Sequence, residues 1–127
     1  MHPAYDDQNI FAKILRGEIP NDTVMESEHT LAFNDIAPQA PVHVLVIPRK
    51  PYLDQDDFFA HASAEEIVDF ARLVAEICKQ KNLSPGAEGS GYRTITNAGK
   101  DGIQEVPHYH LHILGGRRLG RMLAVAE

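Results

Sequence analysis

Three histidines alternate with apolar residues near the end of this 127-residue chain, at His108, His110 and His112. Alternate side chains on a strand face the same way, so a strand here would project three imidazoles from one face at intervals of roughly 6–7 Å. A polar surface would not select histidine three times in five positions. The spacing therefore indicates chemistry, either metal binding or catalysis by imidazole.

Metal binding is the first interpretation of this segment. Two histidines separated by one residue on a strand can bind zinc or iron, and His43 could supply a further ligand. However, no acidic residue follows the segment closely, and Arg117 and Arg118 would repel a divalent cation. The same two arginines suit an anionic substrate, so we expect neither a metal nor another cofactor.

Nucleophilic catalysis is the second interpretation. A neutral imidazole attacks phosphorus and divides one difficult displacement into two easier ones through a phosphohistidine. Neighbouring imidazoles can orient its tautomer, contact the phosphate and carry a proton to the leaving group. Crowded histidines also disfavour protonation, which keeps the nucleophile neutral near pH 7. His110 has a histidine on either side, so it is the expected nucleophile.

The rest of the pattern predicts the elements that position these histidines. Helical periodicity begins after Asn9 and stops before Gly17, and a stronger helix opens with the capping box of Ser63 and Glu66 and continues to about Asn82. Strands are predicted at residues 23–26, 31–34, 43–48, 92–97 and 108–114. Residues 84–91 are predicted to form a loop. This order indicates an α+β fold with an antiparallel sheet.

The composition sets limits on the class of protein. Hydrophobic residues make up 43% and charged residues 24%, which is ordinary for one folded domain over residues 1–127. The net charge of −6 argues against a protein that coats nucleic acid. The single cysteine, Cys78, excludes an internal disulfide and is expected to be buried on the second helix. With no signal peptide or membrane-spanning segment visible, we expect a cytoplasmic protein without a membrane partner.

The histidine segment resembles the signature of the histidine triad (HIT) superfamily. Further segments resemble its Hint branch in the same order, at residues 10–14, 18–20, 31–36, 38–41, 43–48 and 114–117. The resemblance implies a HIT-like fold, in which a five-stranded antiparallel sheet with two helices continues across a homodimer. It implies a purine nucleoside phosphoramidase, which cleaves the P–N bond of substrates such as adenosine 5'-monophosphoramidate or nucleotidylated lysine and leaves AMP or GMP.

The same resemblance implies roles for individual residues. His110 matches the nucleophile that becomes nucleotidylated, and His43, His108 and His112 match the histidines that position it, bind phosphate and relay protons. Asp35 matches the carboxylate that accepts hydrogen bonds from the ribose hydroxyls. The other residues implied in the nucleotide site are Phe11, Ile14, Phe33 and Ile36 around the base, Asn34 next to Asp35 in the chain, and Asn97, Ile103 and Glu105 near the phosphate and leaving group.

Three residues depart from the usual Hint pattern. Ile103 stands where many relatives have glycine, and a positive φ would be costly for this β-branched residue. Glu105 cannot donate a hydrogen bond when ionised, although it could attract a cationic amine such as lysine. Pro107 removes one backbone donor just before the histidines. These changes affect the expected rate and substrate preference rather than the reaction class.

Several alternatives remain open from the residues alone. Ile14 and Phe33 fit a hydrophobic core, Asp35 fits a turn and His43 fits a structural histidine. The function could instead be that of a dinucleoside polyphosphate hydrolase, a nucleotide-binding interaction protein with little turnover, or a metal-binding protein. The apolar residues 122–126 could pack across the interface of a homodimer.

Overall fold

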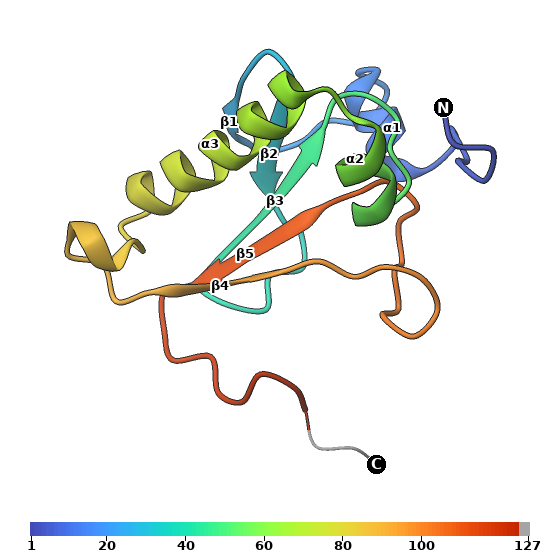
Figure 1. The fold of residues 1–127 in the computed structure, drawn as a ribbon. Coiled ribbons are helices and arrows are strands. Elements are labelled where there is room, and N and C mark those ends of the chain that lie inside the picture. The colour runs from blue at the N-terminus through green and yellow to red at the C-terminus, as the bar shows by residue number, and fades with distance from the viewer. Residues whose placement is uncertain (125–127) are drawn as a thin grey trace.

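The computed structural model describes residues 1–124 and contains one five-stranded sheet (Figure 1). All strand pairs are antiparallel, and the spatial order is β1-β2-β3-β5-β4. The strands are β1 (Thr23–Glu26), β2 (Thr30–Asn34), β3 (Val42–Pro48), β4 (Tyr92–Ile95) and β5 (Leu111–Gly115). The predicted five-stranded antiparallel sheet is therefore confirmed.

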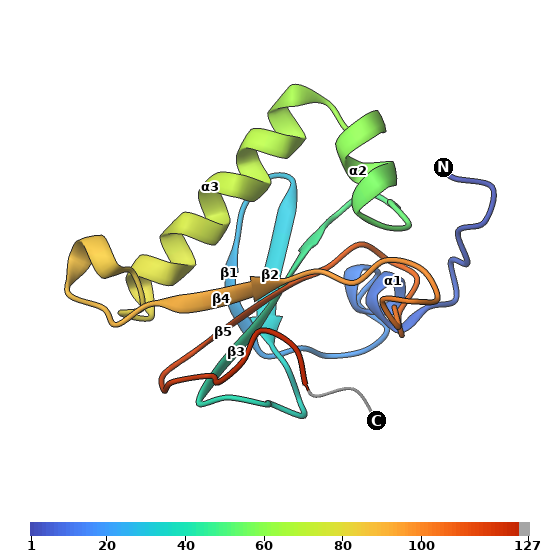
Figure 2. The same cartoon turned by 60° about the horizontal axis from the view of Figure 1, so that its bottom comes forward.

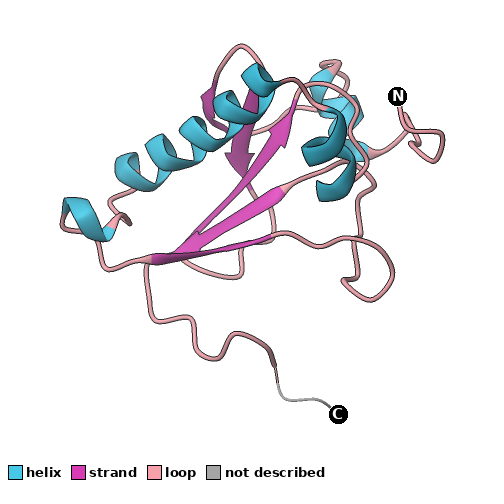
Figure 3. Ribbon diagram, viewed as in Figure 1, coloured by secondary structure: helices cyan, strands magenta, loops and turns pink. Residues whose placement is uncertain are grey.

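Three α-helices and one short 3-10 helix accompany the sheet (Figure 3). They are α1 (Ile10–Leu15), α2 (Gln55–His61), α3 (Ala64–Gln80) and the 3-10 helix η1 (Pro85–Ala87). The expectation of two helices was wrong because α2 spans only 7 residues, too few for a clear helical period. Its one local signal is Asp54, whose side chain accepts a hydrogen bond from the Asp57 N–H as an N-cap. Among residues 1–124, no helix combines the length and apolar character needed to cross a membrane.

Helices cover the sheet from both sides because the strands alternate their side chains. On β3, Val44 and Val46 pack with α2 and α3 in a core that includes Phe58 and Cys78. Leu45, the residue between those two valines, packs in a second core with residues of α1. Figure 2 shows α2 and α3 together on their side of the sheet. The prediction that Cys78 is buried is confirmed.

The histidine segment enters the sheet later than predicted. β5 begins at Leu111, opposite Val46 of β3, so His108 and His110 precede the strand rather than belong to it. Their neighbourhood is held by other bonds: the Tyr109 N–H donates to the Tyr52 carbonyl at 2.8 Å. The side chains of this segment nevertheless still alternate between two faces. Tyr109 lies in the core with residues of α3, whereas His110 and His112 lie together, with ring centroids 5.1 Å apart. Likewise, β4 ends at Ile95 instead of Asn97.

One carboxylate ties α3 to the turn between β1 and β2. Asp69 Oδ2 accepts hydrogen bonds from Ser27 Oγ at 2.6 Å, from Thr30 Oγ1 at 2.8 Å and from the His29 N–H at 3.1 Å. Burial acts to raise the pKa of Asp69, but these hydrogen bonds outweigh it and the pKa is lowered. The ionised form is therefore stabilised by folding.

We expect Asp69→Asn to lower the free energy of unfolding by about 1–3 kcal/mol, because a charged acceptor is lost at a partly buried site. Urea denaturation at pH 7 measures this, with the exposed Asp56→Asn as the matched control. The difference from wild type should shrink as the pH falls below about 4, because a carboxylate with a depressed pKa stabilises the fold only while it is ionised. Equal unfolding free energies at pH 7 would contradict this assignment.

Candidate functional site

Four predicted site residues come together where β3 and β5 pair. His43 on β3 and His112 on β5 place Nε2 and Nδ1 2.9 Å apart. Asp35, just after β2, places Oδ2 3.4 Å from His43 Nε2. The ring of His110 lies 5.1 Å from that of His112. Strand pairing thus joins residues that lie up to 77 positions apart, from Asp35 to His112.

The hydrogen bonds around His43 and His112 assign their tautomers. The Gln39 N–H donates to His43 Nδ1 at 3.1 Å, so a neutral His43 carries its proton on Nε2. That proton is donated to His112 Nδ1, which leaves the proton of neutral His112 on its own Nε2. His112 therefore presents an N–H, which can donate a hydrogen bond to a phosphate oxygen.

The same reasoning gives His110 the opposite orientation. Its Nδ1 lies 2.8 Å from the His108 carbonyl, which can only accept, so Nδ1 carries the proton. The lone pair of His110 therefore remains on Nε2, as a nucleophile requires. The ring packs against the edge of Phe11, with a centroid distance of 5.0 Å. This contact limits the rotation of the imidazole.

His108 is separated from the other histidines by its burial. Its side chain is fully buried, its Nε2 donates to the Pro48 carbonyl at 2.9 Å, and its Nδ1 lies 2.7 Å from the Tyr5 hydroxyl. Both ring nitrogens are occupied by the protein, so this histidine is placed to support its neighbours and not to touch phosphate. Tyr5 was missed by the sequence analysis, since no local pattern links residues 103 positions apart.

Burial keeps the four histidines neutral. Desolvation lowers the pKa of His43 and of His110, and the carboxylate of Asp35 only partly offsets it. Desolvation also lowers the pKa values of His108 and His112. The neighbouring His110 acts on both in the same direction, and each pKa falls to about 4. At pH 7 the site therefore holds neutral imidazoles, as a nitrogen nucleophile needs.

We expect the activity of the site to survive acidification past the ordinary histidine pKa of 6.5. If His110 is the nucleophile, its neutral form is the reactive one, so activity is present above its pKa and is lost as the pH falls through it. Because burial lowers that pKa, the acid limb of kcat/KM should have its midpoint clearly below pH 6.5. Rates from pH 4 to 8 test this, with circular dichroism at each pH to confirm folding. A midpoint at or above 6.5 would contradict it.

The residues expected around the base divide into buried and exposed sets. Phe11, Ile14 and Phe33 are buried in the core beneath α1, as the core interpretation expects. Phe11 and Phe33 form an edge-to-face pair with centroids 5.6 Å apart, and Phe11 also contacts His110. Ile36 is 95% exposed, and Asn34 donates from Nδ2 to Asp22 Oδ2 at 2.9 Å. Phe11 thus connects this apolar cluster to the histidines, whereas Ile36, which follows Asp35 in the chain, is open to solvent.

The residues expected near the phosphate lie on the loop between β4 and the histidines. Glu105 is exposed, and its negative charge acts to raise the pKa of His110. Asn97 is half-buried just beyond β4. Ile103 has a φ of 54° and is 71% exposed, so this β-branched residue adopts the left-handed conformation that favours glycine. The loop therefore holds Ile103 in a strained backbone conformation.

The site also contains a set of atoms that could hold a cation. One ligand atom each from Asp35, His43 and His112 lies within 4.8 Å of the other two. The same pair of histidines shares a hydrogen bond, whose proton a metal bound by both nitrogens would have to replace. His43 and His112 can therefore either bind a metal together or keep the hydrogen bond between them, but not both.

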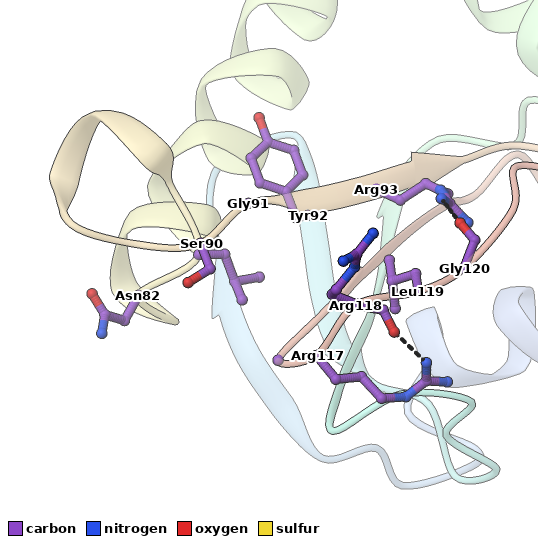
Figure 4. A pocket seen from close by; sticks show the side chains of 11 residues that line it. Asn82, Ser90, Gly91, Tyr92, Arg93, Arg117, Arg118, Leu119 and Gly120 are labelled. Carbon is purple, nitrogen blue, oxygen red and sulfur yellow. Dashed lines mark hydrogen bonds between the residues drawn. The ribbon is translucent and has the colours of Figure 1, made fainter.

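A cavity of about 600 Å³ lies away from the histidines, between the start of β4 and the C-terminal segment (Figure 4). Arg93, Arg117 and Arg118 contribute to its lining. Arg93 donates to the Gly120 carbonyl at 2.9 Å, and Arg117 donates to the Gln39 carbonyl at 3.1 Å. Arg117 therefore holds Gln39, the residue whose N–H donates to His43 Nδ1.

Comparison with known proteins gives consistent matches over nearly the whole chain. A family model described as the HIT domain matches residues 16–119. An uncharacterised 13.2 kDa HIT-like protein of Azospirillum brasilense is 52% identical over 123 residues, covering 97% of this chain and 98% of its own. The purine nucleoside phosphoramidase of Escherichia coli K12 is 42% identical over 121 residues, covering 93% of this chain and 95% of its own.

A solved structure supports the same relationship. The HIT family hydrolase of Clostridium thermocellum superposes with a TM-score of 0.82 at 32% identity, covering 93% of this chain and 99% of its own. The fold, the matched residues and the extent of these identities agree with one another. The chain belongs to the HIT domain family.

Proposed function

We propose that this protein is a nucleotidyl hydrolase that cleaves the P–N bond of purine nucleoside 5'-phosphoramidates through a covalent intermediate on His110. The observation that carries the proposal is the tautomer pair: His110 with its lone pair on Nε2, beside His112 with its proton on Nε2. One imidazole can attack while the other supplies a donor. The Escherichia coli relative named purine nucleoside phosphoramidase supports the substrate class.

The reaction divides into two displacements. In the first, His110 Nε2 bonds to the α-phosphorus and the P–N bond breaks, while the His43–His112 pair gives the departing amine a proton. The pair holds that extra proton in the complex because bound phosphate oxygens and Asp35 favour its charged form. In the second, water adds to phosphorus, the His110–phosphorus bond breaks and the pair recovers a proton from the water. The products are a nucleoside monophosphate and the free amine.

The surrounding residues are assigned to the two ends of the substrate. The purine lies against the apolar wall of Phe11, Ile14, Phe33 and Ile36, and Asn34 and Asp35 line the ribose. Asn97 and the loop carrying Ile103 and Glu105 lie near the phosphate and leaving group. The negative charge of Glu105 near His110 favours a cationic amine, such as a lysine side chain.

We expect Asp35→Asn to weaken AMP binding by about 1–3 kcal/mol, because a charged acceptor for the ribose hydroxyls becomes neutral. Isothermal titration calorimetry with AMP measures the affinity directly. Glu76→Gln on the exposed face of α3 removes a charge elsewhere and serves as the control. If both variants bind AMP as wild type does, Asp35 does not contact the ribose.

The substrate class is tested by comparing two substrates without added metal. Steady-state hydrolysis of an adenosine phosphoramidate should exceed that of a diadenosine polyphosphate. A preference for the dinucleotide would retain the histidine chemistry but assign the protein to a different activity. Nucleotide binding without turnover of either substrate would support the interaction protein instead.

The metal-binding alternative has its own test. Protein purified without added zinc should contain far less than one equivalent of metal by elemental analysis, and a chelator should leave the hydrolysis rate unchanged. A stoichiometric ion that restores activity after its removal would assign Asp35, His43 and His112 to metal binding.

We propose in addition that the whole chain is one domain that forms a homodimer through β4. This strand lies at the edge of the sheet, so its outer backbone groups can pair with another strand. Met122 and Leu123 are exposed apolar residues in the C-terminal segment; residues 125 and 126 of the expected interface lie outside the described part of the chain. Light scattering should give twice the chain mass of 14.1 kDa, and the monomer mass would refute the dimer. A cytoplasmic location stays a prediction, as does the absence of nucleic-acid partners, which the net charge of −6 supports.

A further inference from the structure

An N-terminal tyrosine completes the hydrogen bonds of the most deeply buried histidine. His108 Nε2 lies 2.9 Å from the Pro48 carbonyl, which can only accept, so Nε2 carries the proton. Nδ1 must then accept the hydrogen bond from the Tyr5 hydroxyl, 2.7 Å away. The rings also meet edge to face, with centroids 5.7 Å apart. Tyr5 is thus the partner that favours one tautomer and one orientation of this ring.

The orientation of His108 matters because its backbone holds the proposed nucleophile. The His108 carbonyl accepts the Nδ1–H of His110 at 2.8 Å and so leaves the lone pair of His110 on Nε2. Both residues precede β5, which begins at Leu111, so the sheet ladder does not fix this carbonyl. The Tyr109 N–H, on the same peptide as that carbonyl, donates to the Tyr52 carbonyl at 2.8 Å, and the side chain of His108, anchored at both nitrogens, adds a second constraint.

The N-terminal segment is itself tied to the fold just after this contact. Asn9 caps α1 through Oδ1 and donates from Nδ2 to the Asp6 carbonyl at 2.7 Å. Two residues later, Phe11 places its ring 6.4 Å from that of His108 and 5.0 Å from that of His110. The tyrosine is therefore held firmly enough to act as an anchor.

We propose that Tyr5 is a positioning residue for His110, acting through the ring and the backbone carbonyl of His108. This inference rests on the proposed function, in which His110 is the nucleophile. Without the hydroxyl, the buried Nδ1 of His108 has lost its donor, and the ring is free to change its tautomer or tilt. The carbonyl then holds the His110 Nδ1–H less well, and the reactive tautomer of His110 is less populated.

The test is Tyr5→Phe, which removes only the hydroxyl. We expect kcat for an adenosine phosphoramidate to fall roughly threefold to tenfold, the loss of one modest hydrogen bond, with KM nearly unchanged. Tyr52→Phe is the matched control, since its hydroxyl donates to Glu66 at 2.8 Å and does not contact a histidine ring nitrogen, while its backbone carbonyl, which accepts from the Tyr109 N–H, is retained. Both variants lose one hydroxyl in a partly buried hydrogen bond.

A second readout needs no turnover. Nitrogen-15 NMR of the imidazoles in the free protein should show a protonated Nε2 and a hydrogen-bonded Nδ1 at His108. Tyr5→Phe should shift the His108 Nδ1 resonance and broaden the His110 Nδ1–H proton, whereas Tyr52→Phe should change neither. Wild-type imidazole resonances in Tyr5→Phe would overturn the proposal, even if stability and rate fell together.

The two readouts also separate this proposal from the proposed function. If the wild type hydrolyses no phosphoramidate but Tyr5→Phe alters both imidazoles, the anchor is supported and the reaction is refuted. If the wild type is active and Tyr5→Phe changes neither kcat nor the imidazole resonances, the reaction stands and the positioning role is refuted.

Discussion

His110→Ala should abolish phosphoramidate hydrolysis, lowering kcat by about four orders of magnitude or more, because the group that forms the covalent intermediate is gone. AMP binding should be largely retained, since the ribose and base contacts are assigned to other residues. Steady-state kinetics and calorimetry with AMP separate the two effects. Rapid quenching of wild-type turnover in alkaline denaturant, which preserves a P–N bond, followed by mass spectrometry should recover a nucleotidylated peptide containing His110.

The control for this variant is His61→Ala, which removes a histidine from the exposed end of α2, where its Nδ1 lies 2.8 Å from Asp57 Oδ1. That variant should hydrolyse the substrate as wild type does. Because His110 is itself buried, thermal unfolding must show that His110→Ala remains folded at the assay temperature. Substantial turnover in folded His110→Ala would refute the covalent mechanism.

His112→Gln should lower kcat for an alkylamine leaving group by roughly 10²–10⁴-fold, the range that a positioned proton donor contributes. Glutamine keeps an N–H that can bind phosphate, but it cannot carry the extra proton that the amine requires. The loss should be much smaller for a nucleotide ester of nitrophenol, because nitrophenolate departs without being protonated. The ratio of the two losses measures the proton-transfer role of His112.

Equal losses with both leaving groups would contradict that role and assign His112 to phosphate binding alone. Gln104→Ala is a useful control for general disturbance of the nearby loop. The Gln104 amide nitrogen donates to the Leu53 and Val106 carbonyls at 2.7 and 3.0 Å, and it has no place in the proposed proton path. Any loss of rate that it causes should be the same for the two substrates.

Local patterns predicted the elements of the fold well where they repeat over several turns or strand residues. The capping box at Ser63 and the apolar period after it define α3, whose observed box has both expected hydrogen bonds. The short helix α2 was missed because 7 residues give too little periodicity. The start of β5 was placed three residues early because alternation continues through His108 and His110 without the ladder that makes a strand.

Ile103 shows a local rule overridden by its surroundings. A positive φ is costly for a β-branched residue, yet the structure gives Ile103 a φ of 54°. The preceding Gly102 explains part of this turn: a Cβ there would lie 2.7 Å from the Ala98 carbonyl oxygen, so the chain is tightly folded back on itself. The tight turn therefore determines the backbone conformation of Ile103, against the conformational preference of isoleucine.

By itself, the sequence determined the family, the antiparallel α+β architecture and the three alternating histidines as the place where chemistry is concentrated. Only the tertiary structure decided what each imidazole can do. The tautomers depend on the Gln39 N–H, the His108 carbonyl and the Tyr5 hydroxyl, which reach the histidines through chain folding. The periodicity of a sequence relates residues that are a few positions apart in the chain. The tautomer of an imidazole instead depends on the hydrogen-bond donors and acceptors that lie within about 3 Å of its nitrogens in space. That distance is set by the packed fold.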